Sequence, residues 1–216
     1  MSSLSNDTVI RSAKPDDVNV VVPLIYSSGP VAFDHIFTVE GKGTAQEFLH
    51  FTFQRTGTEF SYTNHHCIEK DGRIVAVGAA FDNRNEFKAI LIMLYHILRF
   101  YGLIKSIGVI RRGLLFEKGV RPPAKGEMAI VHIGVDPNAQ GQGYGRAIMQ
   151  HLIQHGKALS YEKAVLDVAG PNHRARSLYQ SLGFKITKRC PNHNVSRPGE
   201  EELPEHDRME YQYTTP

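Results

Sequence analysis

The segment VDPNAQGQGYGRAIMQ occupies residues Val135 to Gln150. Three glycines stand at alternate positions, 141, 143 and 145, between a β-branched run that ends at Val135 and a helical pattern that follows. Glycine lets backbone N–H groups converge without obstruction by a Cβ atom. Free amides and the positive end of a helix dipole favour a diphosphate there. The segment therefore predicts a phosphate-binding loop, and a tight strand-to-helix turn is the alternative.

Two widespread phosphate motifs do not match this segment. A Walker A loop requires Gly-Lys-Ser or Gly-Lys-Thr, and neither tripeptide occurs in the sequence. A dinucleotide fingerprint that starts at Gly141 needs a third glycine at position 146, where Arg146 stands. The pattern that remains is Q-x-x-G-x-G over residues 140–145, after a strand and at the start of a helix.

Composition predicts one globular domain that spans residues 1–216. Hydrophobic residues make up 41% of the chain and charged residues 22%, which excludes disordered and fibrous classes. A length of 216 residues suffices for one well-buried core and is short for two. The net charge is +3 and no run of Lys or Arg accompanies it, so we expect no nucleic-acid partner.

Sequence features favour a cytoplasmic protein without a membrane span. Cys67 and Cys190 lie far apart in the sequence, and we expect both to be reduced thiols. The start lacks the basic and apolar pattern of a secretory leader. The most apolar run, Ala89 to Leu98, spans ten residues, whereas a membrane helix needs about 20. No C-x-x-C spacing accompanies the 11 histidines, so we expect no metal site.

The periodicity of apolar residues predicts an α+β fold with a central mixed β-sheet flanked by helices. Asp71-Gly72 separates two β-rich runs and predicts a hairpin turn. The predicted strands cover residues 8–14, 65–81 as the hairpin, 127–135, 163–169, 184–189 and 208–213. The predicted helices cover residues 18–26, 46–53, 145–159 and 172–182, with a helical insertion at 87–123 before the central strand. Loops or short helices are expected at 27–43, and a long loop at 191–207.

Two blocks of the sequence resemble the GCN5-related N-acetyltransferases (GNAT), which move acetyl from acetyl-CoA to an amine. The first block is VHIGVDPNAQGQGYGRAIM, and the second is NHRARSLYQSLGF some thirty residues later. The first carries the family's V-x-P lead-in and its Q/R-x-x-G-x-G/A signature at Val135, Pro137, Gln140, Gly143 and Gly145. The second matches the family segment N-x-x-A-x-x-x-Y-x-x-x-G-F at Asn172, Ala175, Tyr179, Gly183 and Phe184. Together the blocks cover residues 131–184, and the first sixty residues and the insertion match loosely or not at all.

The resemblance implies acetyl-CoA as co-substrate. Backbone amides would bind its pyrophosphate, and the strand end would bind the pantetheine arm as another strand. The Ile133 amide would polarise the thioester carbonyl and remove charge from the tetrahedral state. The implied cofactor-binding residues are Ile133, Val135, Gln140, Gly141, Gln142, Gly143, Tyr144, Gly145, Arg146 and Asn172.

The second block implies a general acid. Asn172, Ala175 and Tyr179 are spaced along one helix face, and Asn172 suits the N-cap. A tyrosine so placed is, on its own, more often a packed residue. The resemblance makes Tyr179 the acid that protonates the departing CoA thiolate and Asn172 a hydrogen-bond donor to the cofactor.

The candidate general base is Glu127, on the strand that leads to Val135. In a regular strand Glu127 shares the parity of Ile133 and Val135, and its side chain would face the same side. A solvated charge at the end of the strand is the alternative, because family members that use a strand glutamate place it near Ala129. His132 has the opposite parity and is expected as a packed or surface residue.

The acceptor amine cannot be read from the motifs. Residues 31–37 and 191–207 stand where this family builds its acceptor pocket, and GEEELPEHD within the second range could attract a cation or be a solvated loop. We expect direct acetyl transfer to a small-molecule amine. A peptide or protein amine is an alternative, as is a CoA-binding sensor with weak catalysis. The insertion, apolar nearly all round, predicts a homodimer interface or a lid over the acceptor.

Overall fold

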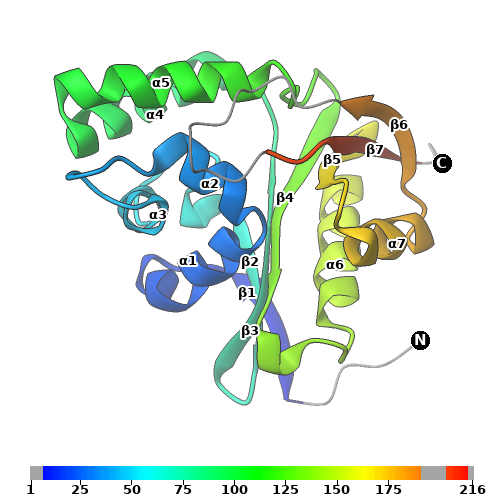
Figure 1. Cartoon of the computed structure of the whole chain (residues 1–216). Helices are drawn as coiled ribbons and strands as arrows, with labels where there is room; N and C mark the ends of the chain where they lie inside the picture. The colour runs from blue at the N-terminus through cyan, green and yellow to red at the C-terminus, as the bar shows by residue number, and fades with distance from the viewer. Residues whose placement is uncertain (1–6, 191–202, 214–216) are drawn as a thin grey trace.

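The computed structural model describes residues 7–190 and 203–213. Its centre is a seven-stranded sheet in the order β1-β2-β3-β4-β5-β7-β6, with β4 and β5 parallel and all other neighbours antiparallel (Figure 1). The strands are β1 (Thr8–Ser12), β2 (His65–Lys70), β3 (Arg73–Phe81), β4 (Glu127–Val135), β5 (Lys163–Ala169), β6 (Lys185–Cys190) and β7 (His206–Gln212). The predicted α+β fold with a mixed sheet is confirmed.

Helices cover both faces of the sheet. They are α1 (Val18–Ser27), α2 (Pro30–Phe37), α3 (Ala45–Phe53), α4 (Glu86–Tyr101), α5 (Leu103–Glu117), α6 (Tyr144–Ala158) and α7 (His173–Ser181). Figure 1 shows α1 to α3 on one face and α6 and α7 on the other. The first face buries Phe48 and Phe53, and the second buries Ile148 and Leu152. We call these the α1 face and the α6 face.

The hairpin between β2 and β3 forms where the sequence predicts it. Asp71 and Gly72 have φ angles of 50° and 73°, the left-handed conformations that a two-residue type I′ turn requires. The strands β4 and β5 begin and end at the predicted residues. Local turn chemistry and β-branched runs are therefore sufficient to place these strands.

The helices before β2 show where packing overrides local preference. Pro23 lies inside α1 without ending it, because Val22 and Ile25 beside it are buried in the core. In the range 27–43, the helix α2 starts at Pro30 in the first turn, where a proline costs no hydrogen bond. Thr44 and Glu47 cap α3 reciprocally.

The insertion forms two helices rather than one. Gly102, with a φ angle of 76°, ends α4 and turns the chain back into α5. The helical pair packs on α2 and α3: Arg112 donates to the Ile36 carbonyl at 2.7 Å, and the Tyr101 hydroxyl donates to the Phe37 carbonyl. The helices end at Glu117, and the remainder of the predicted range 87–123 connects them to β4.

Within the part of the chain that the structure describes, no single helix is long and apolar enough to cross a membrane. The helical segments 15–27 and 30–37 meet the length and composition only as a pair, bent by 104°. Val21, Ile25 and Ile36 from this pair are buried in the core of the α1 face.

Candidate active site

The parallel strands β4 and β5 pair over only three residues. Their ladder runs from Glu127 opposite Lys163 to Ala129 opposite Val165. Beyond it β4 continues to Val135, while β5 pairs on its other edge with β7 as far as Ala169 (Figure 1). We call the unpaired stretch the β4–β5 divergence. It leaves backbone hydrogen-bonding groups in the middle of the sheet that need a partner.

Two of these groups belong to Ile133 and Val135. The Asp136 amide donates to the Val75 carbonyl on the β3 side at 2.9 Å. Because amides alternate in direction along a strand, those of Val135 and Ile133 point the other way, toward β5. The strand end that the sequence assigns to the pantetheine arm thus presents two amides to the divergence.

The glycine loop after β4 leaves its amides unpaired. Gly141 and Gly143 have φ angles of 81° and 91°, and a Cβ atom on either would meet nothing within 4 Å. The first backbone bond of α6 runs from the Ala147 amide to the Gly143 carbonyl at 3.0 Å. Among the described residues, none accepts a backbone hydrogen bond from residues 141–146. Six adjacent donors at a helix N-terminus form a strong site for an anion.

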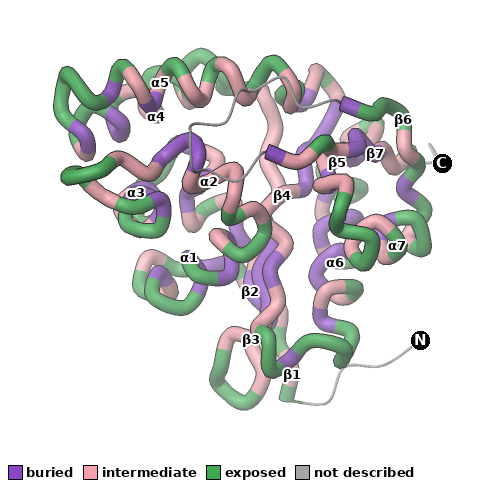
Figure 2. Tube along the Cα trace, viewed as in Figure 1, coloured by how far each residue is buried: buried purple, intermediate pink, exposed green. Residues whose placement is uncertain are grey.

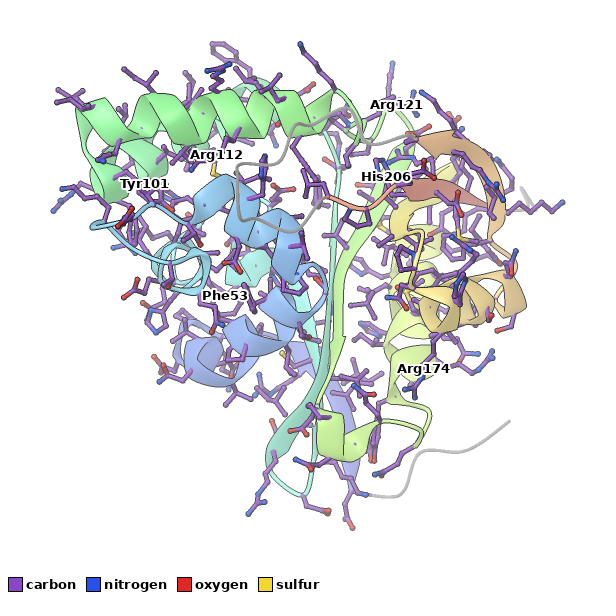
Figure 3. The ribbon with its side chains drawn as sticks, viewed as in Figure 1. Phe53, Tyr101, Arg112, Arg121, Arg174 and His206 are labelled. Carbon is purple, nitrogen blue, oxygen red and sulfur yellow. The ribbon has the colours of Figure 1, made fainter. Side chains whose placement is uncertain are left out.

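Hydrogen bonds connect this loop to α7. Arg174, which Figure 3 labels on α7, donates to Gln140 Oε1 at 3.0 Å. Arg146 donates to Ser181 Oγ at 2.7 Å. Gly145 lies between the two elements, since a Cβ atom there would be in van der Waals contact, at 3.6 Å, with the side chains of Val135 and Leu178. The end of β4, the loop and α7 therefore converge.

Two predicted cofactor residues have side chains engaged elsewhere. The Tyr144 ring is buried in the core of the α6 face. The Gln142 side chain donates to the Asn138 carbonyl at 3.3 Å. Their backbone amides are what remains for a ligand.

The second sequence block forms α7 as predicted, with Asn172 as its N-cap. Asn172 Oδ1 accepts from the Ala175 amide at 3.1 Å. The side-chain nitrogen of Asn172 is the group left for a cofactor contact.

Tyr179 lies two turns into α7 with a buried ring beside Phe184, at a centroid distance of 6.2 Å. No described residue hydrogen-bonds its hydroxyl. Burial raises the pKa of Tyr179 to about 12, so the phenol holds its proton at neutral pH. A protonated, unpartnered hydroxyl is suited to donate a proton.

The parity argument for Glu127 is wrong, because β4 contains a bulge. Ala79 pairs with Val131 and Val77 pairs with Gly134, so two β4 residues, His132 and Ile133, stand opposite Gly78 alone. The extra residue reverses the alternation of faces. Ile133 consequently packs with Leu152 of α6, while Glu127 faces the α1 side.

Glu127 is the centre of an ion-pair cluster and is only 4% exposed. Arg121 donates to its carboxylate at 2.9 Å, Lys163 lies 3.1 Å away, and the Ala124 amide donates at 2.8 Å. These donors outweigh burial and lower the pKa of Glu127. A carboxylate stabilised in its charged form is a poor proton acceptor, which argues against Glu127 as the general base.

The predicted carboxylate-rich loop is described only from residue 203. Asp207 is buried at 4% exposure and pairs with Arg176 at 2.7 Å, so it is not a solvated charge. Its neighbour Arg208 donates to Asp167 on β5 at 2.6 Å. His206, which Figure 3 labels, donates from Nε2 to the Gly119 carbonyl at 3.0 Å. Residues 191–202 of the predicted range 191–207 lie outside the described residues.

Sequence reasoning missed a hydrogen bond between two histidines, His65 Nε2 and His132 Nδ1, which lie 3.1 Å apart. His132 was expected as a packed or surface residue, and its packing is confirmed. The two residues are 67 positions apart, and only the pairing of β2, β3 and β4 brings them together. The only sequence signal for this bond was His132 itself, a histidine directly before Ile133 in the central strand.

A cavity of about 350 Å³ lies elsewhere, at the end of β3 beneath the start of α4. Glu59, His66 and Tyr161 line it, and none of the predicted cofactor residues does. Among the described residues, no group of three or more His, Cys, Asp or Glu side chains could hold a metal ion.

A family model described as "Acetyltransferase (GNAT) family" matches residues 33–184. The chain belongs to the GNAT family. The matched range includes β4, the glycine loop and α7, so the resemblance found in the two sequence blocks is confirmed.

Curated relatives of this GNAT protein are similar over one segment. Mycothiol acetyltransferase of Beutenbergia cavernae is 43% identical over 71 residues, 33% of this chain and 24% of that protein. [Ribosomal protein bS18]-alanine N-acetyltransferase of Escherichia coli K12 is 36% identical over 76 residues, 35% of this chain and 51% of that protein. The chain thus aligns with a quarter to a half of the length of these relatives.

Solved structures share the fold over nearly the whole chain. An N-acetyltransferase from Staphylococcus aureus Mu50 has a TM-score of 0.67 at 15% identity, covering 94% of this chain and 100% of that one. A GCN5-related N-acetyltransferase from Kribbella flavida has a TM-score of 0.59 at 15% identity, covering 97% and 100%.

Proposed function

We propose that this GNAT protein transfers the acetyl group of acetyl-CoA directly to an amine, with a small-molecule amine as acceptor. The observation that carries the proposal is the combination of the β4–β5 divergence and the glycine loop. Both leave amides without partners, and both converge with α7 around Gly145. A diphosphate with an extended amide-bearing arm satisfies both sets of groups at once.

The proposed roles follow from the direction of each group. Amides of residues 141–146 bind the pyrophosphate, and those of Val135 and Ile133 bind the arm. The amine nitrogen attacks the thioester carbon, and the Ile133 amide stabilises the oxyanion that forms. The C–S bond then breaks, and the Tyr179 hydroxyl gives its proton to the thiolate. The proton that the attacking nitrogen loses passes through water and restores the Tyr179 hydroxyl.

A small acceptor fits the surroundings of α2, which spans most of residues 31–37. Arg112 and Tyr101 of the insertion hold α2 from outside through the carbonyls of Ile36 and Phe37. A wall fixed in this way favours a compact ligand over a long peptide. Mycothiol acetyltransferase and the bS18-alanine enzyme show by their names that relatives serve both acceptor classes, so a peptide amine is the alternative.

The test is thiol release from acetyl-CoA in the presence of small amines, peptides with free N-termini, or no acceptor. We expect release that depends on a small amine. Release only with peptides would support the alternative, and CoA binding without release under any condition would identify a sensor.

The loop is tested by Gly143→Glu, which places a Cβ atom in a left-handed conformation and an anion at the phosphate site. We expect CoA binding, measured by calorimetry, to weaken by about 2 kcal/mol or more. The matched control is Gly72→Glu in the β2–β3 turn, which has a similar φ angle of 73° and equally open surroundings. Equal CoA affinity in the two folded variants would refute the assignment of the loop.

A further inference from the structure

The bulge in β4 depends on an unusual backbone conformation at His132. Its φ angle is 57°, in the left-handed region that residues with a Cβ atom rarely adopt. His132 and Ile133 together occupy the place opposite Gly78. The absence of a side chain at Gly78 makes room for Ile133, whose Cδ1 would lie only 2.7 Å from a Cβ atom there.

A directed chain of hydrogen bonds holds the His132 side chain. His65 Nδ1 lies 2.7 Å from the Ser61 carbonyl, which can only accept, so this nitrogen carries a proton. Burial lowers the pKa of His65 to about 4, so at neutral pH its Nε2 is unprotonated and accepts. His132 Nδ1 must then be the donor in the 3.1 Å bond between the two rings.

Aromatic packing fixes the pair from both sides. The rings of His65 and His132 are nearly parallel, with an interplanar angle of 4°. Phe60 stacks on His132 at a centroid distance of 5.3 Å, and Phe53 packs edge-on against His65 at 5.5 Å. With Nδ1 bound to His65 and one ring face covered, the His132 side chain is held over β3 rather than over the divergence.

The bulge determines which way the next amide points. One extra residue before Ile133 brings its side chain to the α6 face and its N–H toward β5. Without the left-handed residue at 132, the strand would be regular, and the direction of the Ile133 amide would reverse.

We propose that the His65–His132 hydrogen bond is a positioning device that holds the β4 bulge and thereby aims the Ile133 amide at the acyl carbonyl. The inference rests on the proposed acetyl transfer. His132 acts through Ile133 and takes no proton from the substrate. The hydrogen bond to His65 offsets the strain of the left-handed backbone at His132.

Two substitutions at position 132 separate positioning from proton transfer. His132→Gly and His132→Ala both remove the imidazole, but only glycine adopts the left-handed conformation without strain. We expect kcat of the alanine variant to be at least tenfold below that of the glycine variant. CoA affinity should fall far less than kcat in both, because the pyrophosphate loop and the Val135 amide are unchanged. Equal loss of kcat in the two variants would make His132 a proton acceptor and overturn the proposal.

His65→Phe tests the anchor itself, because it keeps a ring against Phe53 and removes the accepting nitrogen. We expect a fall in kcat of about tenfold or more with the KM for acetyl-CoA unchanged. Adding His132→Gly should restore part of that loss, which a role in packing alone would not produce. Unchanged kcat in the folded His65→Phe protein, or no rescue, would refute the inference.

Circular dichroism should show all variants folded at the assay temperature. Failure of the proposed function is distinguishable from failure of this inference. In the first case the wild-type protein releases no thiol with any amine. In the second case the wild type is active and the variants do not follow the expected order.

Discussion

Tyr179 combines a buried ring with a hydroxyl that no described residue hydrogen-bonds. Tyr179→Phe keeps the packing beside Phe184 and removes the proton donor. General acids contribute about 10²–10⁴-fold, and we expect a loss of kcat near 10²-fold, because a thiolate with a pKa near 8.5 leaves readily. The KM for acetyl-CoA should change little. Steady-state kinetics at the pH optimum measure both, and an unaffected kcat would leave Tyr179 as a core residue.

A substitution at Glu127 distinguishes a structural role of this residue from a catalytic one. Glu127→Gln removes the anion that Arg208 and Lys163 share, although Asp167 and Glu210 still pair with them. We expect a cost of about 2 kcal/mol in the free energy of unfolding. The pKa of Glu127 is lowered from its ordinary 4.5. Its contribution is therefore complete above pH 4.5 and is lost as the pH falls through the lower, folded-state pKa.

Chemical denaturation of both proteins at several pH values measures this difference. The two stabilities should converge below pH 4.5. At pH 7, where both are folded, kcat of the variant should remain within about twofold of wild type. A loss of 10²-fold or more in kcat would restore Glu127 as the general base.

Residue roles could be predicted where local backbone chemistry alone sets them. Asn172 was identified as an N-cap because a side-chain oxygen in that position satisfies a free amide. The face of Glu127 could not be predicted, because parity counts residues and the bulge at His132 adds one. The His65–His132 bond depends on the register of three strands, which a single sequence does not contain.

Secondary-structure elements, too, could be predicted where local sequence sets them and not where tertiary contacts do. The β2–β3 turn, β4 and β5 were predicted at their boundaries, because Asp71-Gly72 and β-branched runs act over a few residues. For α2 the sequence did not decide between a loop and a short helix, since the stability of this helix comes from contacts with α3 and α5. The division of the insertion at Gly102 was missed, because an isolated glycine in an apolar run reads as a tolerated helix residue.

The candidate site is an arrangement of elements rather than one motif. The glycine loop was predicted because its function is carried by its own backbone. The β4–β5 divergence could not be predicted in this way, since apolar patterning does not report where two parallel strands stop pairing. The position of α5 outside α2 was likewise outside the reach of sequence, although the apolar excess of the insertion indicated that it must cover something.

For the whole molecule, the outer surface of α4 and α5 is the main unexplained feature. Leu103, Ile104 and Ile107 are 79%, 83% and 69% exposed, and Phe87 is 75% exposed. Figure 2 shows exposed stretches along α5. Large apolar patches on globular proteins mark interaction sites, and two-fold dimers are the commonest oligomers. The inner sides of these helices already pack on α2 and α3, so a lid would have to use the same outer face.

We predict that this surface joins two copies of the chain, and Ile104→Glu tests it. A charge at the centre of such an interface should convert a dimer to a monomer in sedimentation equilibrium, because an unpaired carboxylate cannot be buried without large cost. CoA affinity should not change. Val9→Glu is the matched control, since Val9 is 58% exposed on the edge strand β1. Figure 1 shows β1 away from α4 and α5. An unchanged mass with a raised acceptor KM would instead identify a lid. If both mass and kinetics match the control, the surface has neither role.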